Sequence, residues 1–476
     1  MNNDKDFFET PEFRMVIKRY EQMKAENICS YFDTGELADI LSYYLRQGCT
    51  KEAKEVFETA VRLHRRTPET LKMKARIELA EGMPSEALRT VEEIGGSNDT
   101  DLQLLKADIL LSLKDYKAAR YVARTILQQC NITDEIAYDA LEIMLDCGFA
   151  QEVLDITEKG LQYFPSNRNL LEIFAEALIE IQKTDKAIEV YNLLLDENPY
   201  SSFYWEQLGH IYYMIERYGK ALECFEYELT IDDNIEYARM MQAYCYFKLG
   251  NYNECIAIFH SLTSKYPDSI MPLFYIALSH SHNGECNIAM EIYRRIIEIN
   301  KEKERNGIES ALSLINMAII YDNAEMEKDA DQCMEVAMQH ITKASDSKQL
   351  LLCHKKDFYE LRDKENMTFR DMNTTETKEW ELYELFYSLS LSLIKEKKYR
   401  LALYPLYIAR DSAPDTSDID ACIAYILYIH NGDKIEISNM IRSAIEGKSN
   451  TLFELFGIRY DANMGVQQFI KEISNR

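Results

Sequence analysis

A pattern of apolar and small side chains recurs along this chain with a period of 34 residues. Within residues 202–235, Trp205, Leu208, Gly209 and Tyr212 have the spacing of one helical face. Residues of similar kinds stand 34 positions before and after them. A period of this length is typical of proteins that stack copies of one small structural unit. It therefore predicts an extended array of repeats rather than a set of ordinary globular domains.

Each repeat predicts two antiparallel helices, and the twentieth position of a repeat lies where the second helix crosses the first. Close approach at such a crossing requires small side chains. In residues 202–235 these are Gly209 and Ala221, and larger side chains such as Phe225 fill the space around them. Gly209 costs about 1 kcal/mol of helix propensity, which closer packing can offset. The twentieth position of the first ten repeats is occupied by Ala53, Ala87, Ala119, Val153, Ala187, Ala221, Cys255, Ala289, Ala330 and Ala402.

The repeats can be numbered from their expected first residues. The eleven repeats begin at Thr34, Pro68, Thr100, Asp134, Arg168, Ser202, Glu236, Ile270, Ala311, Tyr383 and Ser417. The eleventh carries Glu436 at its twentieth position and is degenerate, but residues 430–433 still have the composition of a turn between helices.

The period and its residue types resemble the tetratricopeptide repeat family along most of the chain. Pro165, Pro199 and Pro267, each at position 32, fit the family pattern because proline stops the second helix before the next repeat. The resemblance implies an all-α fold, a right-handed α-solenoid of helix-turn-helix repeats with capping helices. We expect a bacterial protein.

The chain divides into four segments on this interpretation. Residues 1–33 hold an N-terminal capping helix, with Thr10 as its N-cap and Pro11 as its first residue. Residues 34–343 form the repeat solenoid. Residues 344–382 are a charged segment that interrupts the period, either a connector or an eroded repeat. Residues 383–476 hold a C-terminal repeat pair and capping helices.

Charge and cysteine content restrict the class of partner and the compartment. The formal net charge is −26, which repels phosphate backbones and anionic lipid, so we expect neither nucleic-acid nor membrane binding. The 11 Cys are scattered without paired spacing, as in a reducing compartment. The N-terminus lacks the apolar core of a secretory signal, and we expect a cytoplasmic protein.

The sequence offers no motif for catalysis, a metal or a cofactor. Phosphate-binding loops, zinc-protease motifs and serine nucleophile elbows are absent, so we expect no enzyme activity and no cofactor. His280 and His282 are two residues apart on a helix and point in different directions, which argues against a metal site. The Lys and Asn clamp with which some family members hold chaperone C-termini is also absent, since position 5 in residues 168–235 is Glu172 and then Glu206.

A second stripe on the first helices suggests a binding function. Positions 2, 5, 9 and 12 form a face separate from the packing face, which in the family lines the concave side. Around residues 203–278 this face is rich in aromatic and Met side chains, and such patches usually mark interaction sites. The candidate peptide- or protein-binding residues are Phe203, Glu206, Tyr213, Tyr237, Met240, Met241, Tyr244, Phe247, Met271, Phe274, Tyr275 and Leu278.

We expect a non-catalytic interaction scaffold or adaptor that binds a peptide or helical segment of a partner protein in this groove. The acidic residues before the stripe favour a partner with basic residues at one end. Three alternatives stay open. The chain itself could cover the stripe, the stripe could form a homodimer seam, or the protein could be a regulator whose solenoid changes pitch when the groove is occupied.

Overall fold

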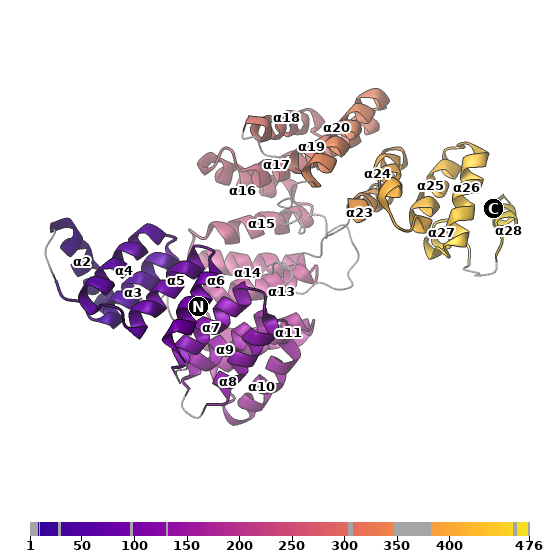
Figure 1. The fold of residues 1–476 in the computed structure, drawn as a ribbon. Coiled ribbons are helices and arrows are strands. Elements are labelled where there is room, and N and C mark those ends of the chain that lie inside the picture. The colour runs from indigo at the N-terminus through magenta and orange to yellow at the C-terminus, as the bar shows by residue number, and fades with distance from the viewer. Residues whose placement is uncertain are drawn as a thin grey trace. The chain divides into compact units, whose positions relative to one another are not determined.

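The computed structural model describes residues 8, 10–26, 30–95, 99–129, 132–302, 308–345, 382–459 and 464–474 of the 476-residue chain. Every regular element in these ranges is a helix, and Figure 1 shows successive helices paired into hairpins. The chain divides into two compact units, residues 1–194 and residues 195–476. The predicted all-α fold of stacked helix-turn-helix repeats is confirmed.

The first unit contains a leading helix, four hairpins and the start of a fifth. Its helices are α2 (Pro11–Glu26), α3 (Thr34–Arg46), α4 (Thr50–His64), α5 (Pro68–Ala80), α6 (Pro84–Ile94), α7 (Thr100–Ser112), α8 (Tyr116–Leu127), α9 (Asp134–Asp146), α10 (Ala150–Tyr163) and α11 (Arg168–Glu180). The boundary between the two units falls within α12 (Thr184–Glu197). The sequence pattern predicts no boundary at this position.

The second unit continues with the same hairpin arrangement. Its helices are α13 (Ser202–Met214), α14 (Tyr218–Ile231), α15 (Glu236–Lys248), α16 (Tyr252–Lys265), α17 (Ile270–His282), α18 (Cys286–Glu302), α19 (Ile308–Asn323), α20 (Glu327–Ser345), α23 (Leu382–Lys395), α24 (Tyr399–Ser412), α25 (Ser417–Ile429), α26 (Lys434–Glu446), α27 (Asn450–Leu455) and α28 (Val466–Ser474).

The predicted starts of the first helices agree closely with the structure. Nine of the eleven coincide with the first residue of a helix, and the other two helices begin at Ile308 and Leu382 rather than at Ala311 and Tyr383. Asp33 shows why the local signal is strong, since its side chain accepts from the backbone N–H of Glu36 and forms a capping box. Turn and cap residues therefore fix the register of the repeats.

The small residues lie in the tightly packed interior, as the period predicts. All ten side chains predicted at the twentieth position are fully buried. Gly209 on α13 faces the ring of Phe225 on α14, and a Cβ atom added to Gly209 would lie only 2.9 Å from that ring. The absence of a side chain at Gly209 is therefore what allows α13 and α14 to pack around a large aromatic residue.

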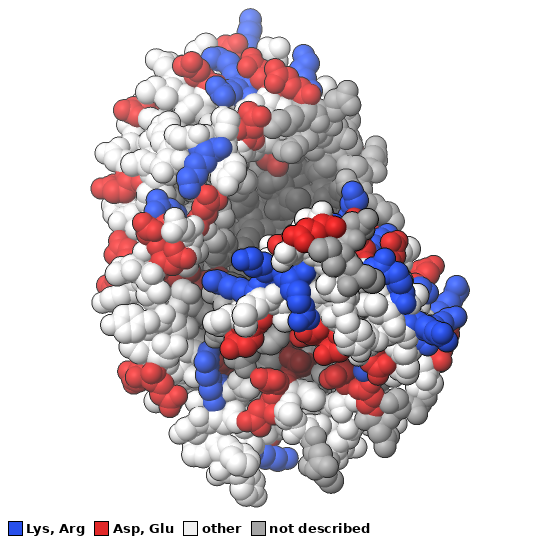
Figure 2. Space-filling model, turned by 90° about the vertical axis from the view of Figure 1, so that its left-hand side faces the viewer, with Lys and Arg blue, Asp and Glu red and all other residues white. Residues whose placement is uncertain are grey.

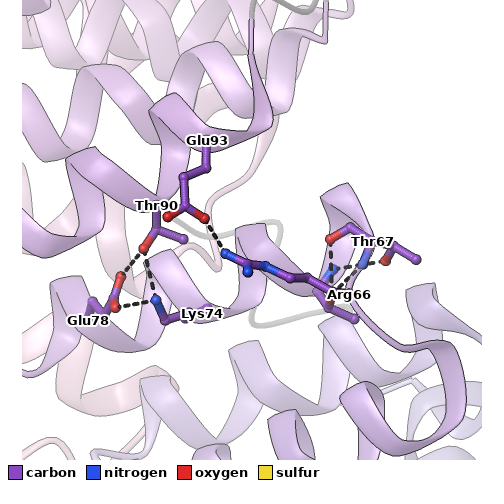
Figure 3. A network of polar contacts seen from close by, with 7 residues as sticks. Arg66, Thr67, Lys74, Glu78, Thr90 and Glu93 are labelled. Atoms are coloured by element: carbon purple, nitrogen blue, oxygen red, sulfur yellow. Dashed lines mark hydrogen bonds and ion pairs between the residues drawn. The ribbon is translucent and has the colours of Figure 1, made fainter.

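The α5–α6 hairpin contains a buried polar group with partners (Figure 3). Thr90 on α6 is 3% exposed, and its hydroxyl donates to Glu78 Oε2 at 2.7 Å and accepts from Lys74 Nζ at 3.3 Å. Lys74 also pairs with Glu78 at 3.1 Å. The three side chains satisfy one another's hydrogen-bonding needs between the helices.

The largest core cluster of the second unit among the described residues runs from α19 and α20 through to α28. One hydrophobic cluster includes Met334 of α20, Phe386 of α23 and Phe469 of α28. Arg400 of α24 donates to Asp322 at the end of α19 at 3.0 Å. The charged segment predicted at 344–382 lies almost entirely outside the described residues, so the choice between connector and eroded repeat stays a prediction.

The surface carries both signs of charge. On the face that Figure 2 shows, acidic and basic side chains are interspersed, and the basic ones form no stripe along its length. Among the described helices, none has the length and apolar content that a bilayer crossing requires.

Candidate functional site

The twelve candidate binding residues lie on α13, α15 and α17, the first helices of three consecutive hairpins in the second unit. We call this set the aromatic stripe. Met241 and Tyr275 are buried, and the other ten side chains are half-buried. None of the twelve is as exposed as Tyr200 or Tyr266 elsewhere in this unit. The stripe therefore presents ring edges and partial side chains rather than fully exposed groups.

Rings of the stripe pack against one another from one first helix to the next. The Tyr244 ring of α15 lies 4.7 Å from the Tyr275 ring of α17, and the Phe247 ring lies 5.3 Å from Tyr275. Tyr244 also contacts Phe259 of α16, with 5.4 Å between the ring centroids. The period predicts a second apolar face on α15 but not these partners. Mutual packing fixes the positions of the rings.

At the α17 end of the stripe, the rings of Tyr252 and His282 lie next to Phe247. His282 stacks on Tyr252 with 4.9 Å between the ring centroids and lies 5.7 Å from Phe247. Burial lowers the pKa of His282. His280 instead pairs with Glu285, so the two histidines have different partners, as their spacing predicts. No group of three potential metal ligands assembles within the ranges that the structure describes.

The α13 end of the stripe is polar. The Tyr237 hydroxyl of α15 and His210 Nε2 of α13 are hydrogen-bonded at 3.1 Å. Glu206, one turn before His210 on α13, has its Oε1 3.8 Å from the same nitrogen. The Glu206 side chain is 32% exposed, while His210 is buried. A carboxylate, an imidazole and a phenol therefore meet where α13 and α15 approach each other.

A fourth group, Glu228 of α14, belongs to this end and was missed by sequence reasoning. Glu228 is 0% exposed, and neither carboxyl oxygen has a hydrogen-bond partner in the structure. Burial, and then the charge of Glu206, raise the pKa of Glu228 to about 8. Burial is the main cause that raises the pKa of Tyr237 to about 12, and the charges of Glu206 and Glu228 add to it. We call Glu206, His210, Glu228 and Tyr237 the polar cluster.

The sequence did contain a signal for Glu228. It stands at position 27 of its repeat, where packing between the helices calls for an apolar residue. The four following repeats carry fully or almost fully buried apolar residues at this position: Leu262, Ile296, Ala337 and Ala409. A Glu at position 27 departs from this pattern, and the departure can be recognised from the sequence by comparing the repeats.

Comparison with known proteins identifies the repeat itself. A family model described as tetratricopeptide repeat matches residues 237–269, which span α15 and α16. An uncharacterized protein of Aquifex aeolicus (strain VF5) is 29% identical over 119 residues, which are 25% of this chain and 61% of that protein. The anaphase-promoting complex subunit cut9 of Schizosaccharomyces pombe is 22% identical over 140 residues, or 29% of this chain. The chain thus spans 61% and 21% of the lengths of these two relatives.

Two solved structures are among those similar to this chain. The match to a tetratricopeptide repeat protein from Parabacteroides merdae covers 51% of this chain and 93% of that protein's chain, with 21% identity and a TM-score of 0.38. The match to a chain of the APC/C hetero-tetramer Cut9–Hcn1 covers 95% of this chain and 94% of that chain, with 13% identity and a TM-score of 0.32. The chain therefore contains a tetratricopeptide repeat at residues 237–269, and helix hairpins in the same register stand before and after it.

Proposed function

We propose that this protein is a non-catalytic interaction scaffold that binds a peptide or helical segment of a partner protein on the aromatic stripe. The observation that carries the proposal is a continuous set of half-buried aromatic and Met side chains on three consecutive first helices. Aromatic side chains provide large apolar contact area at low entropic cost, and such an area suits a groove for a peptide or helix.

The packing within the stripe supports this function. Tyr244 and Phe247 are fixed by Tyr275, so their outer edges need little ordering when a ligand binds. Met240 and Met271, by contrast, have flexible thioether side chains that adapt to the shape of a partner. The stripe therefore combines fixed rings with adjustable side chains.

The proposal can be tested with a full-length double variant, Tyr244→Glu and Phe247→Glu. Both changes place a carboxylate on the stripe, so capture of specific proteins from a native lysate should fall at least about tenfold, measured by quantitative mass spectrometry. Tyr266→Glu is the matched control, because Tyr266 is 54% exposed at the end of α16 and outside the stripe.

Thermal unfolding of each variant distinguishes loss of binding from loss of fold. If a charged variant unfolds early, Tyr244→Gln and Phe247→Gln provide a milder replacement. Unchanged capture by a folded stripe variant would contradict the proposal. Sedimentation of the wild-type protein as a dimer that dissociates in the stripe variant would show instead that the occupant is a second copy.

A further inference from the structure

We propose that the polar cluster of Glu206, His210, Glu228 and Tyr237 is a subsite for a basic side chain, Lys or Arg, of the segment that the aromatic stripe binds. This inference rests on the proposed function and adds the chemistry of one residue of the partner. The partner segment would present its basic residue to α13 and its apolar residues to α15 and α17.

The first argument concerns the partners of the two carboxyl groups in the cluster. Neither Glu206 nor Glu228 forms an ion pair with a Lys or Arg among the residues that the structure describes. Glu228 is fully buried on α14, which packs against α13 and α15, and neither of its carboxyl oxygens has a hydrogen-bond donor. A buried carboxyl without a donor is costly to the fold. A cation placed beside it would offset that cost.

The second argument is that packing does not require Glu228. Corresponding positions in the next repeats are apolar and buried, for example Leu262 and Ile296. A hydrophobic residue at 228 would complete the same interface without a polar group. Exceptions of this kind to local packing rules are concentrated at functional sites in natural proteins.

The third argument is access. Glu206 is partly exposed and Tyr237 is half-buried, so an incoming ammonium or guanidinium group can reach the Glu206 carboxylate beside the Tyr237 ring. A guanidinium can pair with a carboxylate through two parallel hydrogen bonds and also stack on an aromatic ring. A cation at this position also acts on Glu228, whose pKa already responds to the charge of Glu206.

Occupancy of the subsite should be linked to a proton. The titratable side chains of the cluster come from both helices that pack on α14, with Glu206 and His210 on α13 and Tyr237 on α15. The raised pKa of Glu228 means that its carboxyl group is mostly protonated at neutral pH in the free protein. A nearby cation favours the ionised form, so binding releases a proton and affinity rises with pH up to about 8.

The test uses a random dodecapeptide library displayed on phage and selected against the full-length protein. Parallel selections use the Glu206→Gln/Glu228→Gln double variant and, as a matched control, Glu223→Gln, which removes an exposed carboxylate from the same helix α14. We expect peptides from the wild type and the control to share a Lys or Arg near apolar residues, and peptides from the double variant to lack it.

A synthetic peptide from the wild-type selection then provides the quantitative readout by calorimetry. Replacing its basic residue with norleucine, or using the double variant, should weaken binding about tenfold, the scale of one charge-assisted contact. Binding by the wild type should be tighter at pH 8.5 than at pH 6, and Glu228→Gln should lose this difference.

The outcomes separate the two proposals. Selected peptides that need Tyr244 but carry no shared basic residue would overturn the subsite and leave the proposed function standing. Selected peptides that bind equally well to the Tyr244→Glu/Phe247→Glu variant would overturn both.

Discussion

Two hairpins of this protein treat a buried polar side chain in opposite ways. In α5–α6, the Thr90 hydroxyl is buried but bonded to Glu78 and Lys74. In α13–α14, the Glu228 carboxyl group is buried and has no hydrogen-bond partner. A satisfied buried group is close to neutral for stability, whereas an unsatisfied one destabilises the fold. The fold alone explains the buried Thr90 hydroxyl, and the proposed subsite for a basic side chain is our explanation for the buried Glu228.

Both hairpins bury an apolar side chain at position 24 of the repeat. Truncation of this side chain should cause the largest loss in the free energy of unfolding. Phe225→Ala removes a fully buried ring at position 24 of its repeat and should cost about 3–5 kcal/mol in urea unfolding. The matched change Val91→Ala, at position 24 of the α5–α6 repeat, removes only two carbon atoms and should cost about 2 kcal/mol. A loss for Phe225→Ala no larger than for Val91→Ala would contradict the assigned packing on Gly209.

Glu228→Gln sharpens the contrast because it should stabilise the protein. The folded-state pKa of Glu228, about 8, lies above its ordinary value of 4.5. The stability of the wild type therefore decreases as the pH rises from about 4.5 to about 8. Gln does not titrate. The variant should gain about 4 kcal/mol over the wild type at pH 8.5 and almost nothing at pH 4.5, measured by urea unfolding at both pH values.

The exposed change Glu223→Gln is the control for this pH series. It should alter the free energy of unfolding by less than about 0.5 kcal/mol at either pH. A Glu228→Gln variant that is less stable than the wild type at pH 8.5 would show that the carboxylate has a partner.

Gly209→Ala tests the close approach of α13 and α14 directly. The added methyl group would lie 2.9 Å from the Phe225 ring, and the resulting strain should exceed the gain in helix propensity, for a net loss of about 1–2 kcal/mol. In a Phe225→Leu background the same change should cost less, because the ring is gone. Equal losses in the two backgrounds, by thermal or urea unfolding, would argue against this contact.

The smallest effects are expected in the polar network of α5–α6. Thr90→Val keeps the shape of the side chain but leaves Glu78 and Lys74 without the hydroxyl, and should cost about 1 kcal/mol. Arg66→Ala removes an ion pair with Glu93 in which both side chains are more than half exposed, and should cost less than about 0.5 kcal/mol. Reversal of this order in urea unfolding would contradict the role given to burial.

The sequence was sufficient to predict the helices because several independent local signals agree. At Ser202, Glu236 and Ile270 the first helix begins where the period predicts, and small residues such as Ala221 are buried as expected. The registers at Ile308 and Leu382 are less well predicted, since both helices follow breaks in the period.

The site could be predicted only in part. Periodicity shows which face of a helix a residue occupies, so it identifies the aromatic stripe as a set. It does not show which side chains of neighbouring repeats meet, because that depends on the rotation between hairpins. The pairing of Tyr244 with Tyr275, and the convergence of Glu206, His210 and Tyr237 near Glu228, therefore required the structure.

The most direct test of this account is a titration of the Glu228 carboxyl group itself. Glutamate labelled with ¹³C at the carboxyl carbon, incorporated into the full-length protein, gives a resonance for Glu228 that is assigned by its absence from Glu228→Gln. We predict a midpoint near pH 8, as expected for a buried carboxyl without a donor or a cation. A midpoint near 4.5, the ordinary value for glutamate, would contradict the account.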